Sequence, residues 1–301
     1  MSVARAPVRG RPRPSRTRIA VRRLMAFLLI GGAAAVGVWL VSEAIKGDPK
    51  KPKAVPPKVV TLRIVFPEGF TRAQMAERIV AVNKIAVRKR GVDPRLSSKT
   101  YLAATASSLL PATFNGDKKR RSLEGFLFPA TYDFFATTTS KKLVADQLKA
   151  FRRNWKKIDL RYARSKNLTA YDVLNIASMV EEEVLAPDER AKVAAVIYNR
   201  LHARMPLGID ATIRYGLHIP PDKSLTKSEL RSRNPYNTRV HRGLPPTPIG
   251  NPGLASIQAA AHPAKLKYLY FVRKPDKVHH YFTASYADFL RYLKAHGYPT
   301  P

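Results

Sequence analysis

The chain has 301 residues, enough for one large domain or two small ones. It contains no cysteine, which excludes disulfides, thiolate metal sites and a cysteine nucleophile. Its 54 basic and 21 acidic residues give a formal net charge of +33, which favours an anionic partner such as a lipid surface or an acidic polymer. No zinc finger, aromatic RNA-binding motif or basic heptad pattern accompanies this charge, and we therefore expect no nucleic acid partner.

The amino-terminal segment has the pattern of a membrane anchor. Residues 1–23 contain eight arginines among prolines and cannot bury a core. Residues 24–41 have no charged side chain and would form about 27 Å of helix, close to the thickness of a bilayer's hydrocarbon core. The arginines place the amino terminus in the cytoplasm and the remainder of the chain outside the cell membrane. A cleaved signal peptide is the alternative, but no small-residue cleavage site follows.

Beyond a lysine- and proline-rich spacer over residues 42–58, the pattern predicts an α+β fold. Val59–Val65 alternates and predicts a strand, and Pro67-Glu68-Gly69 predicts a turn into a helix over Thr71–Val82. The other expected elements are a strand-like segment over Leu123–Phe135, a helix over Lys141–Trp155, strands over Tyr268–Val272 and His280–Thr283 joined by a turn at Pro275-Asp276, and a last helix capped by Ser285 and ended by Gly297. We expect a small β/α module packed on a larger domain with a helical centre and a sheet of short strands.

A glutamate-rich helix carries the strongest candidates for chemistry. Thr169 and Asp172 form a capping box that opens a helix ending near Glu183. In a helix of this pattern Glu182 points away from the apolar face, whereas Glu181 and Glu183 lie on its two borders, where a carboxyl can be half-buried. The pattern alone does not choose between these two, and three consecutive glutamates on a helix are usually solvated surface.

A second helix is expected from Pro187 to Leu201, with acidic residues in its first turn. Five motifs stand in a characteristic order along the chain: LEGFLFPATY (Leu123–Tyr132), IASMVEEEVLAPDERAKVAAVIYNRL (Ile176–Leu201), IDATIRYGL (Ile209–Leu217), NPYNTRVHRGLPPTPIGNPGLASIQAAAHP (Asn234–Pro263) and HYF (His280–Phe282). With these motifs, the sequence from about Val59 to Gly297 resembles the endolytic murein transglycosylases of the YceG-like family.

The resemblance implies an enzyme that cleaves the β-1,4 bond between N-acetylmuramic acid and N-acetylglucosamine within peptidoglycan strands and leaves 1,6-anhydro ends. No metal or organic cofactor is expected, and a membrane-bound peptidoglycan synthase is an implied partner. The family's catalytic glutamate corresponds to Glu181, and Glu183 matches a second glutamate that orients its neighbour. The residues that match motifs lining the substrate cleft are Asp210, Tyr236, Asn237 and Thr238.

The resemblance also divides the exported part into a LysM-like module over residues 59–120 and a catalytic domain over residues 121–301. Three positions depart from the family pattern and put the affinity of the cleft in doubt: Gly208 replaces a glutamine, Ala130 an aspartate and Phe289 a histidine. Two alternatives stay open. One is a muramidase that uses Asp210 as its second carboxylate, and the other is a wall-binding scaffold without enzymatic activity.

Overall fold

The computed structural model describes residues 25, 31–43, 60–114, 116 and 118–299. The chain divides into two compact units, residues 1–58 and residues 59–301. In the first unit, residues 31–43 form a helix, and most of the basic tail and spacer lies outside the described residues, as does part of the expected membrane span. Within the part of the chain that the structure describes, no helix is both long enough and apolar enough to cross a membrane.

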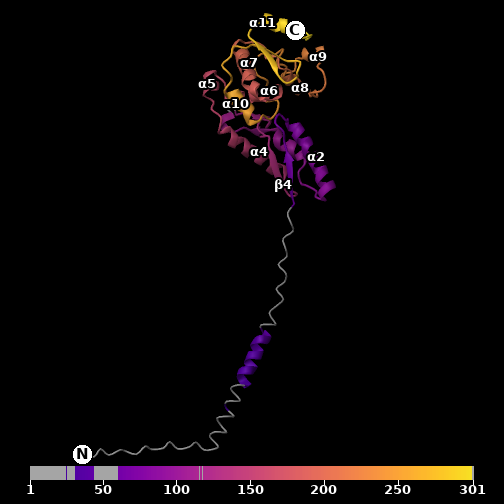
Figure 1. The fold of residues 1–301 in the computed structure, drawn as a ribbon, viewed down its shortest axis with the longest axis vertical. Helices are drawn as coiled ribbons and strands as arrows, with labels where there is room; N and C mark the ends of the chain where they lie inside the picture. The colour runs from indigo at the N-terminus through magenta and orange to yellow at the C-terminus, as the bar shows by residue number, and fades with distance from the viewer. Residues whose placement is uncertain (1–24, 26–30, 44–59, 115, 117, 300–301) are drawn as a thin grey trace, which may run out of the picture. The chain divides into compact units, whose positions relative to one another are not determined.

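The second unit is built from helices and short strands (Figure 1). Its helices are α2 (Arg72–Arg90), α3 (Ser98–Ala106), α4 (Ser140–Trp155), α5 (Arg161–Ser165), α6 (Ala170–Glu183), α7 (Arg190–His202), α8 (Asp210–Leu217), α9 (Lys227–Leu230), α10 (Leu254–Ala261) and α11 (Tyr286–Ala295), with 3-10 turns η1 (Ala112–Phe114) and η2 (Pro187–Glu189). Its strands are β1 (Thr61–Val65), β2 (Ser108–Leu109), β3 (Arg120–Arg121), β4 (Thr131–Phe135), β5 (Tyr270–Arg273) and β6 (His280–Thr283). They pair as three separate antiparallel sheets, β1–β4, β2–β3 and β5–β6. The α+β prediction is therefore confirmed, with small separate sheets.

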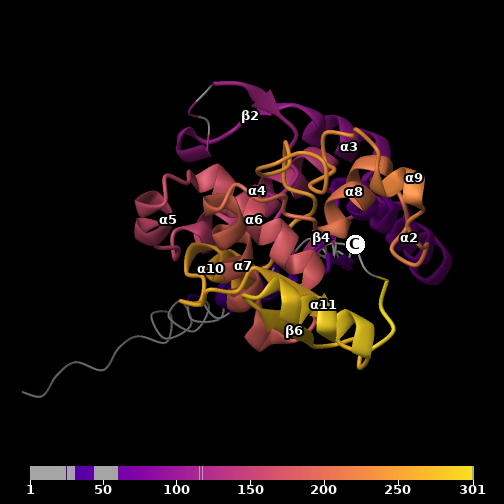
Figure 2. The ribbon, with the colours of Figure 1, turned by 90° about the horizontal axis from the view of Figure 1, so that it is seen from above.

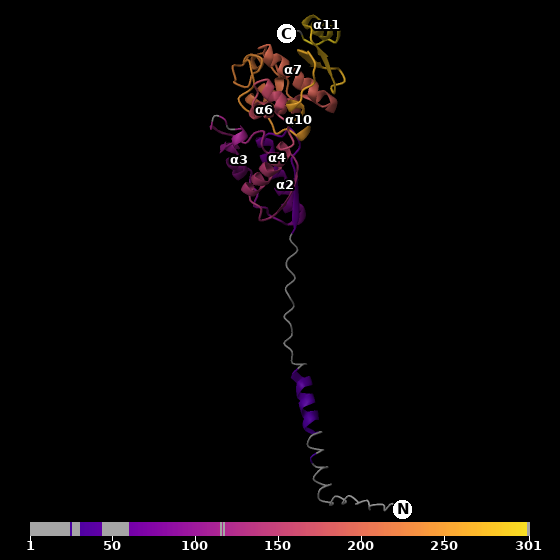
Figure 3. The same cartoon turned by 90° about the vertical axis from the view of Figure 1, so that its left-hand side faces the viewer.

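Helix α6 forms the centre of this unit. It begins at the predicted capping box, in which Thr169 and Asp172 each accept a hydrogen bond from the other's backbone N–H. Every residue from Val173 to Val180 is buried, because α7 and α10 pack beside α6 (Figures 2 and 3). The helix is thus buried on almost all sides rather than along one stripe. Asn175 and Ser178 are buried with the apolar residues and are hydrogen-bonded, and the run Glu181–Glu183 ends the helix.

Strand β1 pairs with β4 in antiparallel register, with Leu62 opposite Phe134 and Ile64 opposite Tyr132. Burial alternates along β1, as its residue pattern predicts. Because β4 lies beyond residue 120, this pairing crosses the expected boundary between the two modules. The helix that follows β1 is longer than predicted, because it continues through a basic last turn to Gly91, which adopts φ +60° at the cap.

The expected strand over Leu123–Phe135 was partly wrong, since only Thr131–Phe135 is extended as β4. Gly125 turns the preceding segment at φ +88°, and the ring of Pro248 lies where a side chain at this position would stand. The N–H of Leu127 donates to Asn251 Oδ1 at 2.9 Å rather than to a neighbouring strand. Apolar and aromatic residues in this stretch therefore mark a buried loop.

The carboxyl-terminal prediction is confirmed with small shifts in its limits. Strand β5 begins at Tyr270, and β6 has the predicted limits. The side chain of Ser285 caps α11 by accepting from the N–H of Asp288, and Gly297 follows the helix at φ +70°.

Candidate active site

Three segments meet the carboxyl end of α6 at Glu181. The N–H of Gly253, at the start of α10, donates to Glu181 Oε2 at 2.9 Å. The guanidinium of Arg190, at the start of α7, lies 3.9 Å from Glu181 Oε1. Only 8% of the Glu181 side chain is exposed. Because a backbone donor and a cation act on different oxygens, the carboxylate is held in one orientation.

The third segment is the predicted turn, in which Gly69 adopts φ +82°. A Cβ added to Gly253 would overlap the Glu68 carboxylate, so Glu68 lies directly on the backbone that donates to Glu181. Burial of its carboxyl raises the pKa of Glu68, the charge of Glu181 adds to the rise, and Arg190 opposes it. Sequence reasoning predicted the turn but missed its place at the site.

Glu182 is exposed over much of its side chain, as the helical pattern predicted. Its carboxyl nevertheless lies beside the turn and not in open water, because Oε1 is 2.9 Å from where a Cβ on Gly69 would stand. Burial raises the pKa of Glu182 to about 7, and the charges of Glu181, Glu183 and Glu124 contribute to the rise. Substitution of Glu182 is therefore not a neutral control for this site.

Glu183 belongs to a second cluster, which lines a cleft of about 520 Å³. Burial and the charge of Asp210 raise the pKa of Glu183 to about 7, while Arg273 and Arg239 oppose the rise. Asp210 pairs with Arg239 at 2.7 Å, and Arg273 donates to the backbone carbonyl of Glu183 at 2.7 Å. The structure therefore brings together two of the expected site residues, Glu183 and Asp210, in a cleft rich in arginine.

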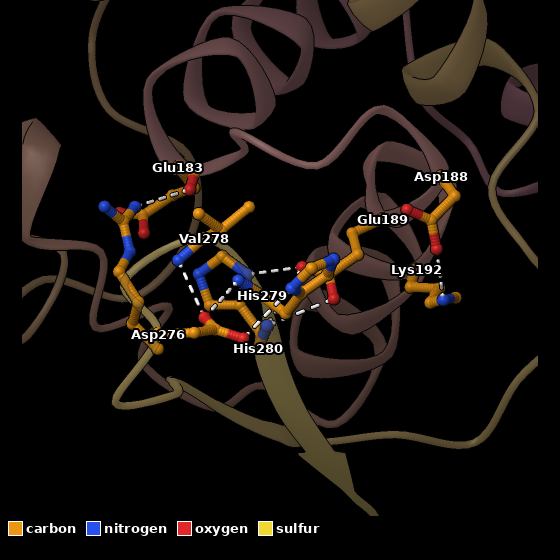
Figure 4. Close-up of polar contacts among 9 residues, drawn as sticks. Glu183, Asp188, Glu189, Lys192, Asp276, Val278, His279 and His280 are labelled. Carbon is orange, nitrogen blue, oxygen red and sulfur yellow. Dashed lines mark hydrogen bonds and ion pairs between the residues drawn. The ribbon is translucent and has the colours of Figure 1, made fainter.

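The hairpin β5–β6 is fixed beside the cleft that Glu183 lines by polar contacts (Figure 4). Its residue His280 donates its backbone N–H to the Glu189 carboxylate, and its Nδ1 lies 2.7 Å from Glu189 Oε2. Burial lowers the pKa of His280, and Glu189 opposes this. The adjacent His279 bonds to Asp276 in the turn. Among the described residues, no three His, Asp or Glu side chains form a group that could hold a metal ion.

The other expected cleft residues hold a loop in place. Asn237 is buried and donates to the carbonyls of Leu230 and Ser232, and Thr238 accepts from the N–H of Ile209. The hydroxyl of Tyr236 bonds to that of Thr247. These bonds fix the loop that carries Arg239 against the start of α8, where Asp210 stands. Direct contact of Tyr236, Asn237 or Thr238 with substrate stays a prediction.

Sequence reasoning missed a buried network that joins the turn to the larger domain. Glu124, 2% exposed, accepts from the N–H of Arg72 at 3.0 Å, from Asn251 Nδ2 at 2.8 Å and from the Tyr215 hydroxyl at 3.1 Å. Asn251 also donates to the carbonyl of Phe70. Burial raises the pKa of Glu124 to about 7. The sequence offered one indication of this network, because Glu124 and Asn251 both lie within the family motifs given above.

The three departures from the family pattern have distinct structural settings. Gly208 adopts φ +63°, a conformation that favours glycine, and its N–H donates to the carbonyl of Thr238. Ala130 contributes its carbonyl, which accepts from the N–H of Phe66 at 3.0 Å. Phe289 lines the cleft and stacks on Tyr270 with ring centroids 5.3 Å apart. Gly208 and Phe289 therefore line the cleft, whereas Ala130 does not.

Comparisons with known proteins give a consistent result. The sequence model of the YceG-like family matches residues 43–295. An endolytic murein transglycosylase of Bacillus subtilis is 35% identical over 71% of this chain, and one of Streptococcus pneumoniae strain R6 is 31% identical over 85%. This chain spans 59% and 48% of their lengths, respectively. A crystal structure of a YceG-like protein from Listeria monocytogenes superposes with a TM-score of 0.60 at 28% identity, covering 77% of this chain and 76% of that one.

Proposed function

This chain belongs to the YceG-like family, and we propose that it is an endolytic murein transglycosylase in which Glu181 is the acid and base. The relatives that carry this name support the reaction. The observation that supports the residue is the setting of Glu181, where a buried helix ends and a backbone N–H, a guanidinium and a second carboxylate meet. One fixed carboxyl suits a reaction that needs a single group in two roles.

In the proposed mechanism, protonated Glu181 gives its proton to the glycosidic oxygen as the bond from C1 of N-acetylmuramic acid to that oxygen breaks. The sugar's own 6-hydroxyl then attacks C1 and passes its proton to the Glu181 carboxylate. The product is a 1,6-anhydro ring, and Glu181 is again protonated. No water is consumed, and no second carboxylate has to act as nucleophile or base. The Gly253 N–H and Arg190 would stabilise Glu181 in its ionised state between the two halves.

The arginine-rich cleft is the proposed binding surface for the glycan. Its lining includes Arg200, Arg239 and Arg273, which favour an anionic polymer, and Tyr270 and Phe289, whose rings offer apolar surface. Glu183 would orient groups at the boundary between this cleft and Glu181.

Two other assignments of the chemistry have specific support. Glu183 lines the cleft and has a pKa near 7, which suits an acid at neutral pH. A muramidase would instead pair a carboxylic acid with Asp210, which lies in the same cleft as Glu183. A muramidase leaves reducing ends, whereas the proposed enzyme leaves anhydro ends.

The deciding experiment is mass analysis of the fragments released when the full-length protein, in detergent, digests purified peptidoglycan. We expect anhydro ends from wild type and almost none from Glu181→Gln. Reducing ends would establish the muramidase, and no fragments at all would favour the wall-binding scaffold.

The remaining proposals concern where the enzyme acts. We propose that residues 24–41 anchor the chain in the cell membrane with its amino terminus in the cytoplasm, supported by the uncharged run behind eight arginines. The unit formed by β1, α2 and α3 would act as a LysM-like glycan-binding module, and a peptidoglycan synthase would be a partner. Protease added to cells stripped of their outer wall should degrade residues beyond 43 and spare the arginine-rich tail; the reverse pattern would overturn the orientation.

A further inference from the structure

Glu68 stands far from Glu181 in the sequence, yet the two carboxylates share one backbone segment. The N–H of Gly253 donates to Glu181 Oε2, and a Cβ on the same Gly253 would overlap the Glu68 carboxylate. A Cβ on Gly69, the residue after Glu68, would lie 3.7 Å from Cγ of Glu181. The turn between β1 and α2 therefore carries a second carboxylate to the proposed acid.

Charged groups from several elements face this pair of carboxylates. They are Glu182 from α6 and Arg190 from α7, and Glu124 from the loop before β4 acts on Glu182. The start of α10 contributes the Gly253 N–H and the hydroxyl of Ser256, to which Arg190 Nε donates at 3.2 Å. Among these groups, the carboxyls outnumber the one guanidinium, that of Arg190. Since like charges held close together resist simultaneous ionisation, the cluster keeps a proton at a pH where an isolated carboxyl would lose it.

We propose that Glu68 is a positioning residue of the active site, whose carboxyl is electrostatically coupled to that of Glu181 across the Gly253 backbone, and that Arg190 opposes this coupling. The proposal rests on the function proposed above. The geometry supports the coupling, because the Gly253 backbone touches both carboxylates and Arg190 lies 3.9 Å from Glu181 Oε1. In agreement with it, burial raises the pKa of Glu68, the charge of Glu181 adds to the rise, and Arg190 opposes it. An electrostatic coupling between two groups is reciprocal. The acid on α6 would thus depend on how the amino-terminal turn is seated.

The test is the pH dependence of the rate at which anhydro ends form, measured with the full-length protein and isolated glycan strands. An acid catalyst loses activity as pH rises through its kinetic pKa. Glu68→Gln removes the like charge, so the high-pH side of the pH–rate profile, where the rate declines (the descending limb), should move to lower pH by about one unit. Arg190→Gln removes the opposing charge, so the limb should move to higher pH. Glu68→Asp keeps the charge and should return the limb toward its wild-type position.

A matched control is Glu77→Gln, which removes another exposed glutamate, from α2, and should leave the profile unchanged. Glu68 lies on an exposed turn, so unfolding temperatures of its variants should stay close to that of wild type. An unshifted limb in Glu68→Gln, or an equal loss of rate at every pH, would overturn the proposal. Failure of the proposed function is distinguishable, because wild type would then form no anhydro ends, or Glu181→Gln would form them as fast as wild type.

Discussion

Two carboxylate clusters lie at the end of the same helix, only two residues apart, and they have opposite character. Glu181 is enclosed, bonded to a backbone N–H and covered by a turn from the amino-terminal part of the unit. Glu183 lines an arginine-rich cleft, and its charged neighbours, such as Asp210, come from later segments. Successive positions on a helix point in directions about 100° apart, so neighbouring glutamates can meet entirely different segments. Identical side chains at one helix end can therefore serve different roles.

The largest expected effect comes from replacing the proposed acid of the enclosed cluster, Glu181. Glu181→Gln keeps the size of the side chain and an acceptor for the Gly253 N–H, but it removes the transferable proton. Formation of anhydro ends should fall by about 10²–10⁴ or more. Glu183→Gln should reduce the rate by less, since it loses only an orienting charge. Both rates are measured from released fragments.

If Glu183→Gln abolished cleavage while Glu181→Gln retained it, the acid would belong to the cleft cluster. A control for general charge loss is Glu77→Gln. Retained binding of all three proteins to glycan strands would show that the difference lies in the chemical step.

The next effect concerns the close contact that defines the enclosed cluster. Gly250→Ala places a methyl group 2.3 Å from the backbone carbonyl oxygen of Gly69, so the turn or the segment before α10 has to move. We expect a loss of about 1–3 kcal/mol in the free energy of unfolding, typical of overpacking, together with a reduced rate. Gly116→Ala is the matched control, because nothing lies within 4 Å of its added Cβ and its φ is not positive. Equal stability of the two variants would show that the turn is loosely seated.

The contrast between the clusters also explains what the sequence could predict. The capping box and the end of α6 follow local rules, and hence Glu181 and Glu183 were found as candidates. Glu68, Arg190 and Glu124 act through segments brought together only by folding. The periodic spacing of apolar residues along a helix or strand does not predict contacts between segments that are far apart in the sequence. The strand prediction over residues 123–130 failed for the same reason, because tertiary contacts there replaced strand pairing.

The third prediction concerns the buried network beneath the turn. Glu124 has a folded-state pKa of about 7, above the ordinary value of 4.5, so the folded chain binds this proton more tightly than the unfolded chain. Its stabilising contribution is complete below pH 4.5 and is lost as pH rises through 7. The pKa values of Glu182 and Glu183 are also raised by folding, so their contributions to stability fall with pH in the same way. The free energy of unfolding from denaturant titrations should therefore fall between pH 4.5 and pH 7.

Glu124→Gln resembles the protonated carboxyl, retaining an acceptor for the N–H of Arg72 and for Asn251. It should fold, and it should flatten the decline in stability with pH. A decline as steep as that of wild type would show that Glu124 is not the group that titrates.

The smallest expected effect comes from removing the charge of Asp210, which lines the cleft beside Glu183. Asp210 and Arg239 form a partly exposed ion pair, so Asp210→Asn should change the free energy of unfolding by less than about 1 kcal/mol. The charge of Asp210 raises the pKa of Glu183, so its removal should lower that pKa. If Asp210 only lines the cleft, glycan affinity should change modestly and anhydro ends should still form. Arg239→Gln is the control, because it breaks the same ion pair from its other side.

A muramidase would respond differently, because Asp210 would then activate water. In that case Asp210→Asn would abolish cleavage, while Arg239→Gln would not. The kind of end released by these two variants therefore tests whether the cleft cluster binds the strand or cuts it.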